Sequence, residues 1–401
     1  MGFLLYKKVM SDKELELYIH IPFCIRKCNY CDFLSFSCDE EGIEKYVTTL
    51  VEEIRCKASD YKDDMITSVF IGGGTPSILS DDQIERIMNV VKNNYNLSDC
   101  CEITIESNPG TLTEEKLLAY KKSGINRLSI GLQSADDDEL KLLGRIHDHQ
   151  TFVDNYNLAR KLGFDNINVD LISAIPGGNI EKFKESLLKV VELNPEHISV
   201  YSLIIEEGTP FYQIYGQGGP LEDRLISEDD DREIYHQTKK LLAEAGYNQY
   251  EISNYAKVGR ECQHNIGYWI RKNYIGFGLG SSSLYDNVRY KNTSDIKEYL
   301  SCINEDMCHF DNISYGYMKH YEVEKLADNE IISEYIYLGL RMNKGINLKE
   351  ISEIVGQDVY EIYKVWIDMC AHDGLIVIED KTICLTDKGQ DLANYVMAGF
   401  V

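Results

Sequence analysis

No apolar run in the sequence approaches the roughly 20 residues that are needed to cross a bilayer. The N-terminus places its two lysines after a very short apolar stretch, which is the wrong order and length for a secretory signal. Tyr6 stands where a myristoylation pattern requires Ser or Thr. Internal repeats and low-complexity tracts are also missing. We therefore expect a cytoplasmic protein without an integral membrane segment.

Positive charge is scarce as well. The chain has 41 Lys and Arg against 66 Asp and Glu, which gives a formal net charge of −25. Such a surface repels phosphate backbones and anionic lipid heads, so nucleic acid is not an expected partner. Twelve cysteines in 401 residues without a secretory signal indicate reduced thiols, some of them metal ligands. The hydrophobic fraction of 44% and the charged fraction of 27% are typical of a soluble globular protein rather than a disordered one.

Short β-rich runs alternate with helix-like stretches through the first half of the chain. Such alternation predicts an α/β fold with parallel strands and crossover helices. Six strand–helix units end near residue 205, fewer than the eight of a full TIM barrel, so we expect a partial (β/α)6 TIM-like barrel. The predicted strands are residues 16–21, 68–71, 102–106, 127–131, 166–172 and 197–205.

The rest of the chain divides into two parts. Residues 208–312 are less regular and rich in Tyr and Gly, and we expect loops and sheet that complete the first domain, with the acidic run 228–231 as a solvated face. From about Tyr321 the pattern is helical again, and two β runs flanking residues 379–381 predict a hairpin. Helices followed by a hairpin resemble a winged helix. The expected domains are therefore residues 1–312 and a C-terminal winged-helix-like α+β domain, residues 313–401.

Three cysteines, Cys24, Cys28 and Cys31, follow the first predicted strand at C-x3-C-x2-C spacing. Three thiolates at this spacing can hold three irons of a 4Fe–4S cluster and leave the fourth iron open to another ligand. Structural zinc usually takes four ligands in C-x2-C pairs, and the bacterial ferredoxin pattern is C-x2-C-x2-C-x3-C-P, so neither fits. A zinc site completed by Cys38 or His20 is the alternative.

Glycines follow the second predicted strand in Gly72-Gly73-Gly74-Thr75-Pro76-Ser77. Barrel sites are built at the carboxyl ends of the strands, and glycines there let the backbone approach a ligand closely. The segment lacks the Lys of a P-loop and does not fit G-x-G-x-x-G, so nucleotide phosphates are not indicated. The alternative is a turn without special function.

Polar residues end the later predicted strands. Glu106, Gln133 and Asp170 occupy such positions, and Arg145 lies between the fourth and fifth strands. A guanidinium group matches a carboxylate in a bidentate fork, so Arg145 is a candidate for binding the carboxylate of a ligand. Individually, residues of these types are more often helix caps or surface residues.

The cysteine spacing, with the aromatic Tyr30 before the last cysteine, resembles the radical S-adenosylmethionine superfamily. The resemblance implies a partial barrel of six β/α units and a 4Fe–4S cluster whose open iron is chelated by S-adenosylmethionine. In that superfamily one electron from the cluster cleaves S-adenosylmethionine to a 5′-deoxyadenosyl radical.

A narrower resemblance is to the oxygen-independent coproporphyrinogen III oxidase-like family, and within it to the HemW heme-chaperone branch. The motifs that carry it are Tyr-Ile-His-Ile-Pro-Phe-Cys, Gly-Gly-Gly-Thr-Pro-Ser, Glu-Ser-Asn-Pro-Gly-Thr, Gly-Leu-Gln-Ser and Leu-Gly-Arg-Ile-His. The family more often has an aromatic residue and a glycine where this chain has Ser173-Ala174. By this resemblance, the residues that contact S-adenosylmethionine are Tyr18, Tyr30, Gly73, Gly74, Thr75, Glu106, Gln133, Arg145 and Asp170.

Two functions are implied. A heme chaperone binds heme as cargo and hands it to a heme-accepting protein. An oxidase of the coproporphyrinogen III dehydrogenase type carries out radical oxidative decarboxylation in porphyrin biosynthesis. The oxidases of this family carry a substantial segment ahead of the first barrel strand, whereas this chain has about 15 residues there, which favours the chaperone. Either function needs an electron donor for the cluster.

A heme site is predicted at His264-Asn265-Ile-Gly-Tyr268-Trp269, where a His stands beside an amide and two aromatic residues. Imidazole is a common axial ligand of heme iron, and aromatic rings supply a flat apolar surface. This pattern also recurs in the HemW-like branch. The alternative is that His264 and Asn265 cap or brace a loop and that Trp269 belongs to the core.

Overall fold

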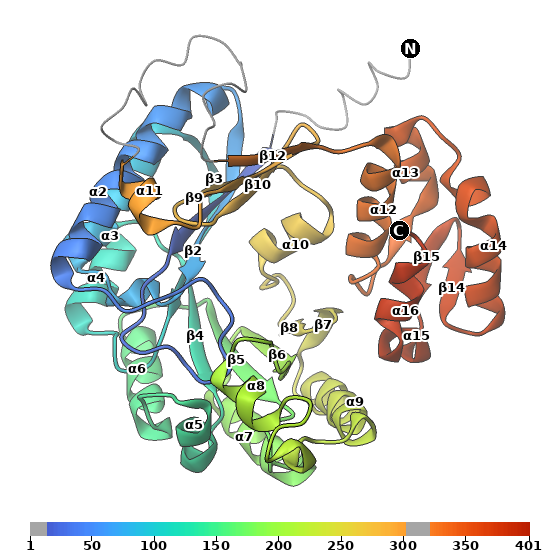
Figure 1. The fold of residues 1–401 in the computed structure, drawn as a ribbon, viewed down its shortest axis with the longest axis horizontal. Coiled ribbons are helices and arrows are strands. Elements are labelled where there is room, and N and C mark those ends of the chain that lie inside the picture. The colour runs from blue at the N-terminus through green and yellow to red at the C-terminus, as the bar shows by residue number, and fades with distance from the viewer. Residues whose placement is uncertain (1–13, 302–320) are drawn as a thin grey trace.

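The computed structural model describes residues 14–301 and 321–401. Six parallel strands lie side by side in chain order at the centre of a twelve-stranded sheet (Figure 1). The expected α/β barrel of six units is confirmed. The six strands are β1 (Glu14–Ile21), β2 (Met65–Gly73), β3 (Asn96–Ser107), β4 (Arg127–Gln133), β5 (Ile167–Ser173) and β6 (His197–Ser202).

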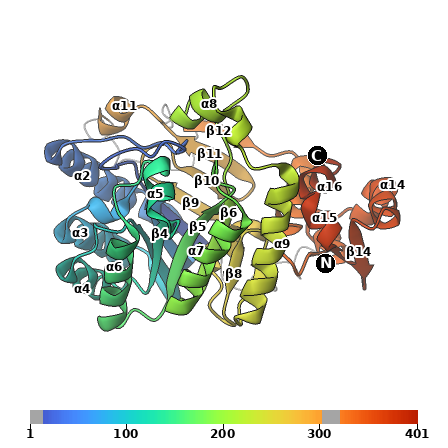
Figure 2. The ribbon, with the colours of Figure 1, turned by 90° about the horizontal axis from the view of Figure 1, so that it is seen from below.

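Crossover helices cover the outer face of this sheet (Figures 1 and 2). In α3, the Ser80 hydroxyl caps the first turn in a capping box with Gln83. The same helix buries Ile84, Ile87 and Met88 at three- and four-residue spacing against the strands. The covering helices are α2 (Glu40–Lys57), α3 (Asp81–Asn94), α4 (Glu114–Lys122), α5 (Asp137–Leu143), α6 (His149–Lys161) and α7 (Ile180–Leu193).

Successive side chains of a strand point to opposite faces, which gives this sheet an apolar outside and a polar inside. In β1, Leu17 and Ile19 are completely buried toward the helices. The alternate residues Glu16, Tyr18 and His20 therefore point into the barrel, where Glu16 is only 1% exposed. Burying titratable groups inside a barrel is unfavourable, so each of these groups either has a polar partner or stays uncharged.

The middle of the chain contains helices that the sequence did not predict. Helix α9 (Glu228–Glu244) begins in the acidic run, where Ser227 caps the first turn and the carboxylates face the positive end of the helix dipole. The strands expected there are present and extend the sheet at both edges. The remaining elements of this part are α8 (Pro210–Tyr215), β7 (Asn248–Glu251), β8 (Asn254–Ala256), α10 (Gln263–Trp269), β9 (Tyr274–Phe277), β10 (Ser282–Tyr285), β11 (Val288–Asn292) and α11 (Ile296–Ser301).

The C-terminal unit has its own hydrophobic core. The expected hairpin is present, and its turn residues Asp380 and Lys381 both have positive φ, as a tight hairpin turn requires. The unit consists of α12 (Asp328–Gly339), β13 (Ile346–Asn347), α13 (Leu348–Val355), α14 (Val359–His372), β14 (Ile376–Glu379), β15 (Thr382–Leu385), α15 (Asp387–Asp391) and α16 (Ala393–Ala398).

The boundary predicted between residues 312 and 313 lies outside the described residues. Strand β12 (Tyr321–Lys325), which follows it, pairs with β11 and thus belongs to the large sheet. Ion pairs join the C-terminal unit to the barrel. Glu334 of α12 accepts from Arg271 Nε at 2.8 Å and also pairs with Arg289 of β11. The guanidinium of Arg341 lies 4.4 Å from the ring centroid of Trp269 in α10.

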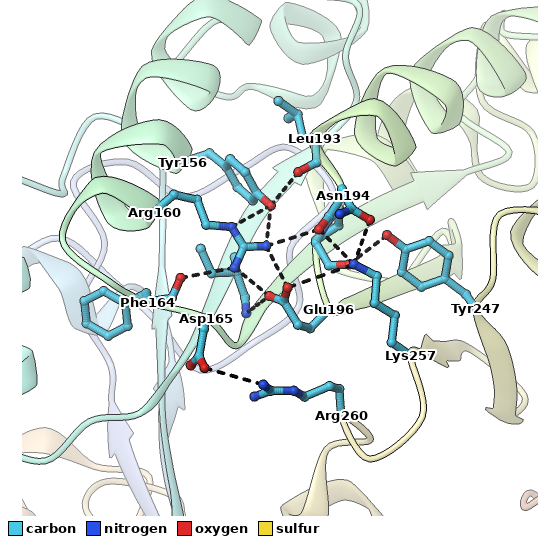
Figure 3. A network of polar contacts seen from close by, with 12 residues as sticks. Tyr156, Arg160, Phe164, Asp165, Leu193, Asn194, Glu196, Tyr247, Lys257 and Arg260 are labelled. Carbon is cyan, nitrogen blue, oxygen red and sulfur yellow. Dashed lines mark hydrogen bonds and ion pairs between the residues drawn. The ribbon is translucent and has the colours of Figure 1, made fainter.

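At the amino ends of the parallel strands, Glu196 is the centre of a polar network (Figure 3). Its carboxylate accepts from Arg160 Nη1 at 2.7 Å and Nη2 at 3.0 Å, and from the backbone N–H of Ile167, the first residue of β5. Lys257, just after β8, donates to Asn194. These contacts fix α6, the start of β6 and the segment after β8 to one another. Within the described ranges, no helix is both long and apolar enough to cross a membrane.

Candidate functional site

The three motif cysteines lie in the loop between β1 and α2, at the carboxyl end of the parallel strands. All three are partly buried. The backbone N–H of Cys24 donates to Phe36 O at 3.1 Å, which closes the loop on itself. Asn29 donates through its N–H to Leu143 O and accepts from the N–H of Phe211. The loop is therefore held between α5 and α8.

A chain of polar contacts connects two of the cysteines through three other loops. Arg145 Nη1 lies 3.5 Å from Cys28 Sγ, and Nη2 donates to Asn108 Oδ1 at 2.5 Å. Asn108 Nδ2 donates to Thr75 Oγ1 at 2.8 Å, which leaves the Thr75 hydroxyl hydrogen free to point at Cys24 Sγ, 3.5 Å away. Both sulfur atoms thus face a hydrogen-bond donor.

The glycine segment after β2 packs against the start of the cysteine loop. Gly73 has φ +116°, and a Cβ there would come within 2.5 Å of the His20 ring. A Cβ on Gly74 would lie 2.7 Å from Phe23 O. Backbone bonds from Gly74 to Ile21 and from Thr75 to Phe23 complete the contact. Glycine is required here because the two loops approach so closely, and this approach places Thr75 beside Cys24.

Glu106 lies next to the carboxyl end of β3, but Asp170 lies in the middle of β5 and does not end that strand as the sequence predicted. Glu106 Oε2 accepts from Gly73 N at 3.0 Å, and burial together with the Asp170 charge raises the pKa of Glu106 to about 8. Asp170 accepts from Ser129 Oγ at 3.0 Å and Asn168 Nδ2 at 2.7 Å, and burial raises its pKa as well. A positively charged or hydroxyl-bearing ligand beside Glu106 would favour its ionised form.

Gln133 ends β4 at a strand irregularity. It has φ +73°, and the pairing of β4 with β5 shifts register there. A Cβ on Gly131 would lie 2.8 Å from Gln133 Nε2 and 3.4 Å from Arg145 Nη2. The amide of Gln133 and the guanidinium of Arg145 therefore both lie over Gly131, so the structure brings these two predicted site residues together.

Tyr18 and His20 lie on the inner face of β1. The Tyr18 hydroxyl is 3.0 Å from His20 Nδ1, and His20 Nε2 is 3.1 Å from Leu34 O. Because a carbonyl only accepts, Nε2 carries the hydrogen and Nδ1 accepts from Tyr18. Both ring nitrogens are thus occupied, which argues against His20 as a zinc ligand. Cys38, the other candidate, is exposed at the start of α2.

The chemistry of this donor set fits an iron–sulfur cluster and a zwitterionic ligand. In the described part of the chain, no three His, Cys, Asp or Glu side chains gather closely enough to hold a single metal ion. A cubane needs no such gathering, because each thiolate binds a different iron. Arg145 Nε is buried and has no hydrogen-bond partner, so a donor remains available for a ligand carboxylate.

Sequence reasoning missed two residues of this site, Asn108 and His147. Asn108 belongs to Glu-Ser-Asn-Pro-Gly-Thr, a segment in which only Glu106 was singled out. His147 lies two residues after Arg145, and its Nε2 is 3.2 Å from Leu132 O while Nδ1 has no partner. Burial and the nearby Arg145 lower the pKa of His147 to about 4. His147 is therefore neutral, and its Nδ1 is an unused acceptor.

The predicted heme ligand His264 is buried and belongs to α10, a helix that contacts β2 and α12 (Figure 1). Its Nδ1 is 2.8 Å from Ser68 Oγ and its Nε2 is 3.0 Å from Tyr268 OH, while the ring stacks on Phe70. Burial lowers its pKa to about 3. Neither nitrogen is open to a heme iron in this structure, so the geometry supports the alternative that this segment braces the fold. Asn265, Tyr268 and Trp269 are only partly buried.

Comparisons with known proteins identify the family of this chain. The family model "Radical SAM superfamily" matches residues 18–190, and the model "HemN C-terminal domain" matches residues 326–392. The heme chaperone HemW of Bacillus subtilis is 34% identical over 385 residues, 96% of this chain and 98% of that protein. HemW of Escherichia coli is 40% identical over 270 residues, 67% and 69% of the two chains.

The fold also matches a solved structure. Coproporphyrinogen III oxidase (HemN) from Escherichia coli, described as a radical SAM enzyme, superposes with a TM-score of 0.83 at 24% identity over 99% of this chain and 92% of that chain. At this identity the match concerns the fold alone. The relatives of full length, together with the two family models, show that the chain belongs to the HemW family of the radical SAM superfamily.

Proposed function

We propose that this protein is a heme chaperone of the radical SAM type, which binds a 4Fe–4S cluster, S-adenosylmethionine and heme, and transfers heme to a recipient protein. The observation that carries the proposal is the connection from Cys28 through Arg145, Asn108 and Thr75 to Cys24. It gives the cysteine motif of a family whose curated relatives are named heme chaperones the local chemistry that cluster binding needs.

Cys24, Cys28 and Cys31 would hold the cluster. Hydrogen bonds to ligand sulfur atoms stabilise their negative charge and influence the reduction potential of a cluster. Thr75 and Arg145 are placed to supply such bonds to Cys24 and Cys28. When bound, the cluster supplies the electron with which this superfamily acts on S-adenosylmethionine.

The residues at the strand ends would hold S-adenosylmethionine. Arg145 offers its unpartnered Nε to the carboxylate of the ligand. Glu106 and Asp170 offer acceptors to hydroxyl and ammonium groups, and Gln133, beside Arg145, offers an amide. Tyr18, Tyr30, Gly73 and Gly74 complete the predicted contact set. A zwitterionic ligand with a ribose is matched by this combination of one guanidinium and two carboxylates.

An anaerobic experiment separates the chaperone from the oxidase. Reconstituted protein is incubated with S-adenosylmethionine, dithionite and coproporphyrinogen, and protoporphyrinogen is measured. In parallel, heme-loaded protein is mixed with apomyoglobin as acceptor, and the Soret band is followed. We expect heme binding and transfer without protoporphyrinogen. Formation of protoporphyrinogen at more than one equivalent, with no heme transfer, would contradict the proposal and identify an oxidase.

A further inference from the structure

Three apolar side chains beside the cluster motif are exposed to solvent. Ile25 is 61% exposed, Phe33 69% and Ile146 54%. Together with the exposed cations Arg26 and Lys27 they form a surface that we call the loop patch. Large exposed apolar side chains gathered on one surface typically mark an interaction site.

The charge of the loop patch is opposite to that of the molecule. The chain carries a net charge of −25, yet residues 25–33 contain two cations, Arg26 and Lys27, and one carboxylate, Asp32. Lys27 Nζ donates to the carbonyl of Phe33 at 3.0 Å, which leaves its charge uncompensated. Among the described residues, neither cation lies in an ion pair. A positively charged surface on a strongly acidic protein favours a negatively charged partner.

The loop patch lies directly over one of the predicted cluster ligands. Ile25, Arg26 and Ile146 line a cleft whose other walls include Cys28 and Arg145. Ile25, Arg26 and Ile146 thus share one cleft with Cys28. A molecule seated on the loop patch would therefore approach the cluster more closely than one seated on the helices outside the barrel.

We propose that the loop patch is the docking surface of an acidic one-electron carrier protein, of the flavodoxin or ferredoxin class, that reduces the cluster. The inference rests on the proposed function, because it requires a cluster held by the three cysteines. One electron leaves the reduced carrier, which is oxidised by one unit, and the cluster gains that electron. The apolar side chains supply the contact area, and Arg26 and Lys27 attract the carrier.

The test uses cluster-loaded protein with reduced flavodoxin as the probe. Arg26→Glu alone and Phe33→Ser alone leave the Lys27 hydrogen bond to the loop in place. The control is the double variant Lys349→Glu with Val365→Ser, which alters an exposed cation and an exposed apolar residue of the C-terminal unit. Cluster reduction is followed by absorbance, and binding of flavodoxin by calorimetry. Dithionite, a small reductant, measures whether the cluster itself is unchanged.

We expect Arg26→Glu to slow reduction by flavodoxin about tenfold or more at low salt, and added salt to shrink the difference. Phe33→Ser should weaken flavodoxin binding, while the control and the dithionite rates stay unchanged. Equal flavodoxin rates in all variants would overturn the inference, and so would an effect confined to heme affinity or to self-association. A protein without iron after reconstitution would instead contradict the proposed function.

Discussion

The three motif cysteines differ from the other cysteines in their surroundings and spacing. Cys24 and Cys28 face Thr75 and Arg145, whereas Cys38 is exposed and its thiol lies 4.0 Å from Asp39 Oδ1. Replacing any of the three by Ala should abolish the iron content and the charge-transfer absorbance of anaerobically reconstituted protein. Cys38→Ala is the matched control and should retain both, as should variants of Cys100, Cys101 and Cys262. Zinc without iron in elemental analysis would contradict this prediction.

Asn108 should control the S-adenosylmethionine site without touching the cluster. Its side chain holds Arg145 through Oδ1 and Thr75 through Nδ2. Asn108→Ala leaves both without this partner, and we expect calorimetry to show binding weakened by about 1–3 kcal/mol at unchanged iron content. Asn108→Asp keeps an acceptor for Arg145 and should cost less. Arg145→Ala should weaken binding by about 2–5 kcal/mol. Unchanged affinity in Asn108→Ala would remove this residue from the site.

Ala174 occupies a position where the family more often has glycine. Its φ is +55°, in the left-handed region that costs an alanine about 1–2 kcal/mol. Ala174→Gly relieves this strain but gives the unfolded chain more freedom, so we expect a net gain of up to about 1 kcal/mol in the free energy of unfolding. Ala243→Gly, in helix α9, should lower the free energy of unfolding by about 0.5–1 kcal/mol. Urea titration measures both variants. A loss in both variants would show that the backbone at Ala174 is not strained.

At the scale of elements, periodicity predicted α3, which has a wide apolar face, and missed α9 and α10. Helix α3 buries five residues, whereas α9, which is three residues longer, buries Ile234, Thr238 and Leu242. Because α9 buries so few residues, its sequence shows only a weak helical periodicity. Its acidic first turn also resembles a solvated loop. Helix α10 spans only Gln263–Trp269, which is too short for any periodicity to show.

The candidate site likewise has parts that the sequence predicted and parts that it did not. The cysteine motif is local, since its three residues lie within eight positions, so the sequence shows it directly. Asn108 and Arg145 are 37 residues apart and meet only because β3 and β4 are neighbours in the sheet. The burial of His264 depends on Ser68, 196 residues away, and no local pattern contains that pairing.

The network around Glu196 (Figure 3) should stabilise the barrel independently of the site, because it lies at the amino ends of the strands and the cysteine loop lies at their carboxyl ends. Glu196→Ala leaves the partly buried Arg160 without its ion pair, and we expect the free energy of unfolding to fall by about 1–3 kcal/mol. Lys45→Ala, which removes an exposed pair with Glu41, should change it by less than about 1 kcal/mol. Urea titration measures both. Lost iron binding in a folded Glu196→Ala protein would contradict this separation.

At the scale of the whole molecule, the barrel is closed on its open side by α10 and by the C-terminal unit (Figures 1 and 2). Closure requires Gly267, because a Cβ there would lie 2.1 Å from the carboxylate of Glu16. As a consequence of this closure, the carboxyl group of Glu16 is buried. Glu16 Oε2 has no hydrogen-bond partner, and Lys272 Nζ lies 3.8 Å from Oε1. The polar interior that accommodates the site therefore makes the stability of the protein depend on pH.

Burial raises the pKa of Glu16 to about 8, against the opposing charge of Lys272. Between about pH 4.5 and 8 the native state holds this proton and the unfolded state does not, so stability falls as pH rises through this range. Glu16→Gln should remove this loss, and its stability relative to the parent should rise by up to about 1.4 kcal/mol per pH unit. The raised pKa of Glu106 likewise makes the free energy of unfolding fall as pH rises. The lowered pKa values of buried His147 and His264 have the opposite effect, so below about pH 6.5 they make the free energy of unfolding increase with pH.

Several groups titrate in this pH range. The contribution of Glu16 is therefore taken from the difference in the free energy of unfolding between Glu16→Gln and the parent. Urea unfolding of the cluster-free protein at pH 5.5, 7 and 8.5 measures it, with Glu41→Gln, which changes an exposed carboxylate, as the control. We expect the stability gap between Glu16→Gln and the parent to widen toward pH 8.5, and the gap for Glu41→Gln to stay constant. Parallel curves for Glu16→Gln and the parent would mean that this carboxyl group is ionised at neutral pH despite its burial, and that Lys272 compensates its charge in full.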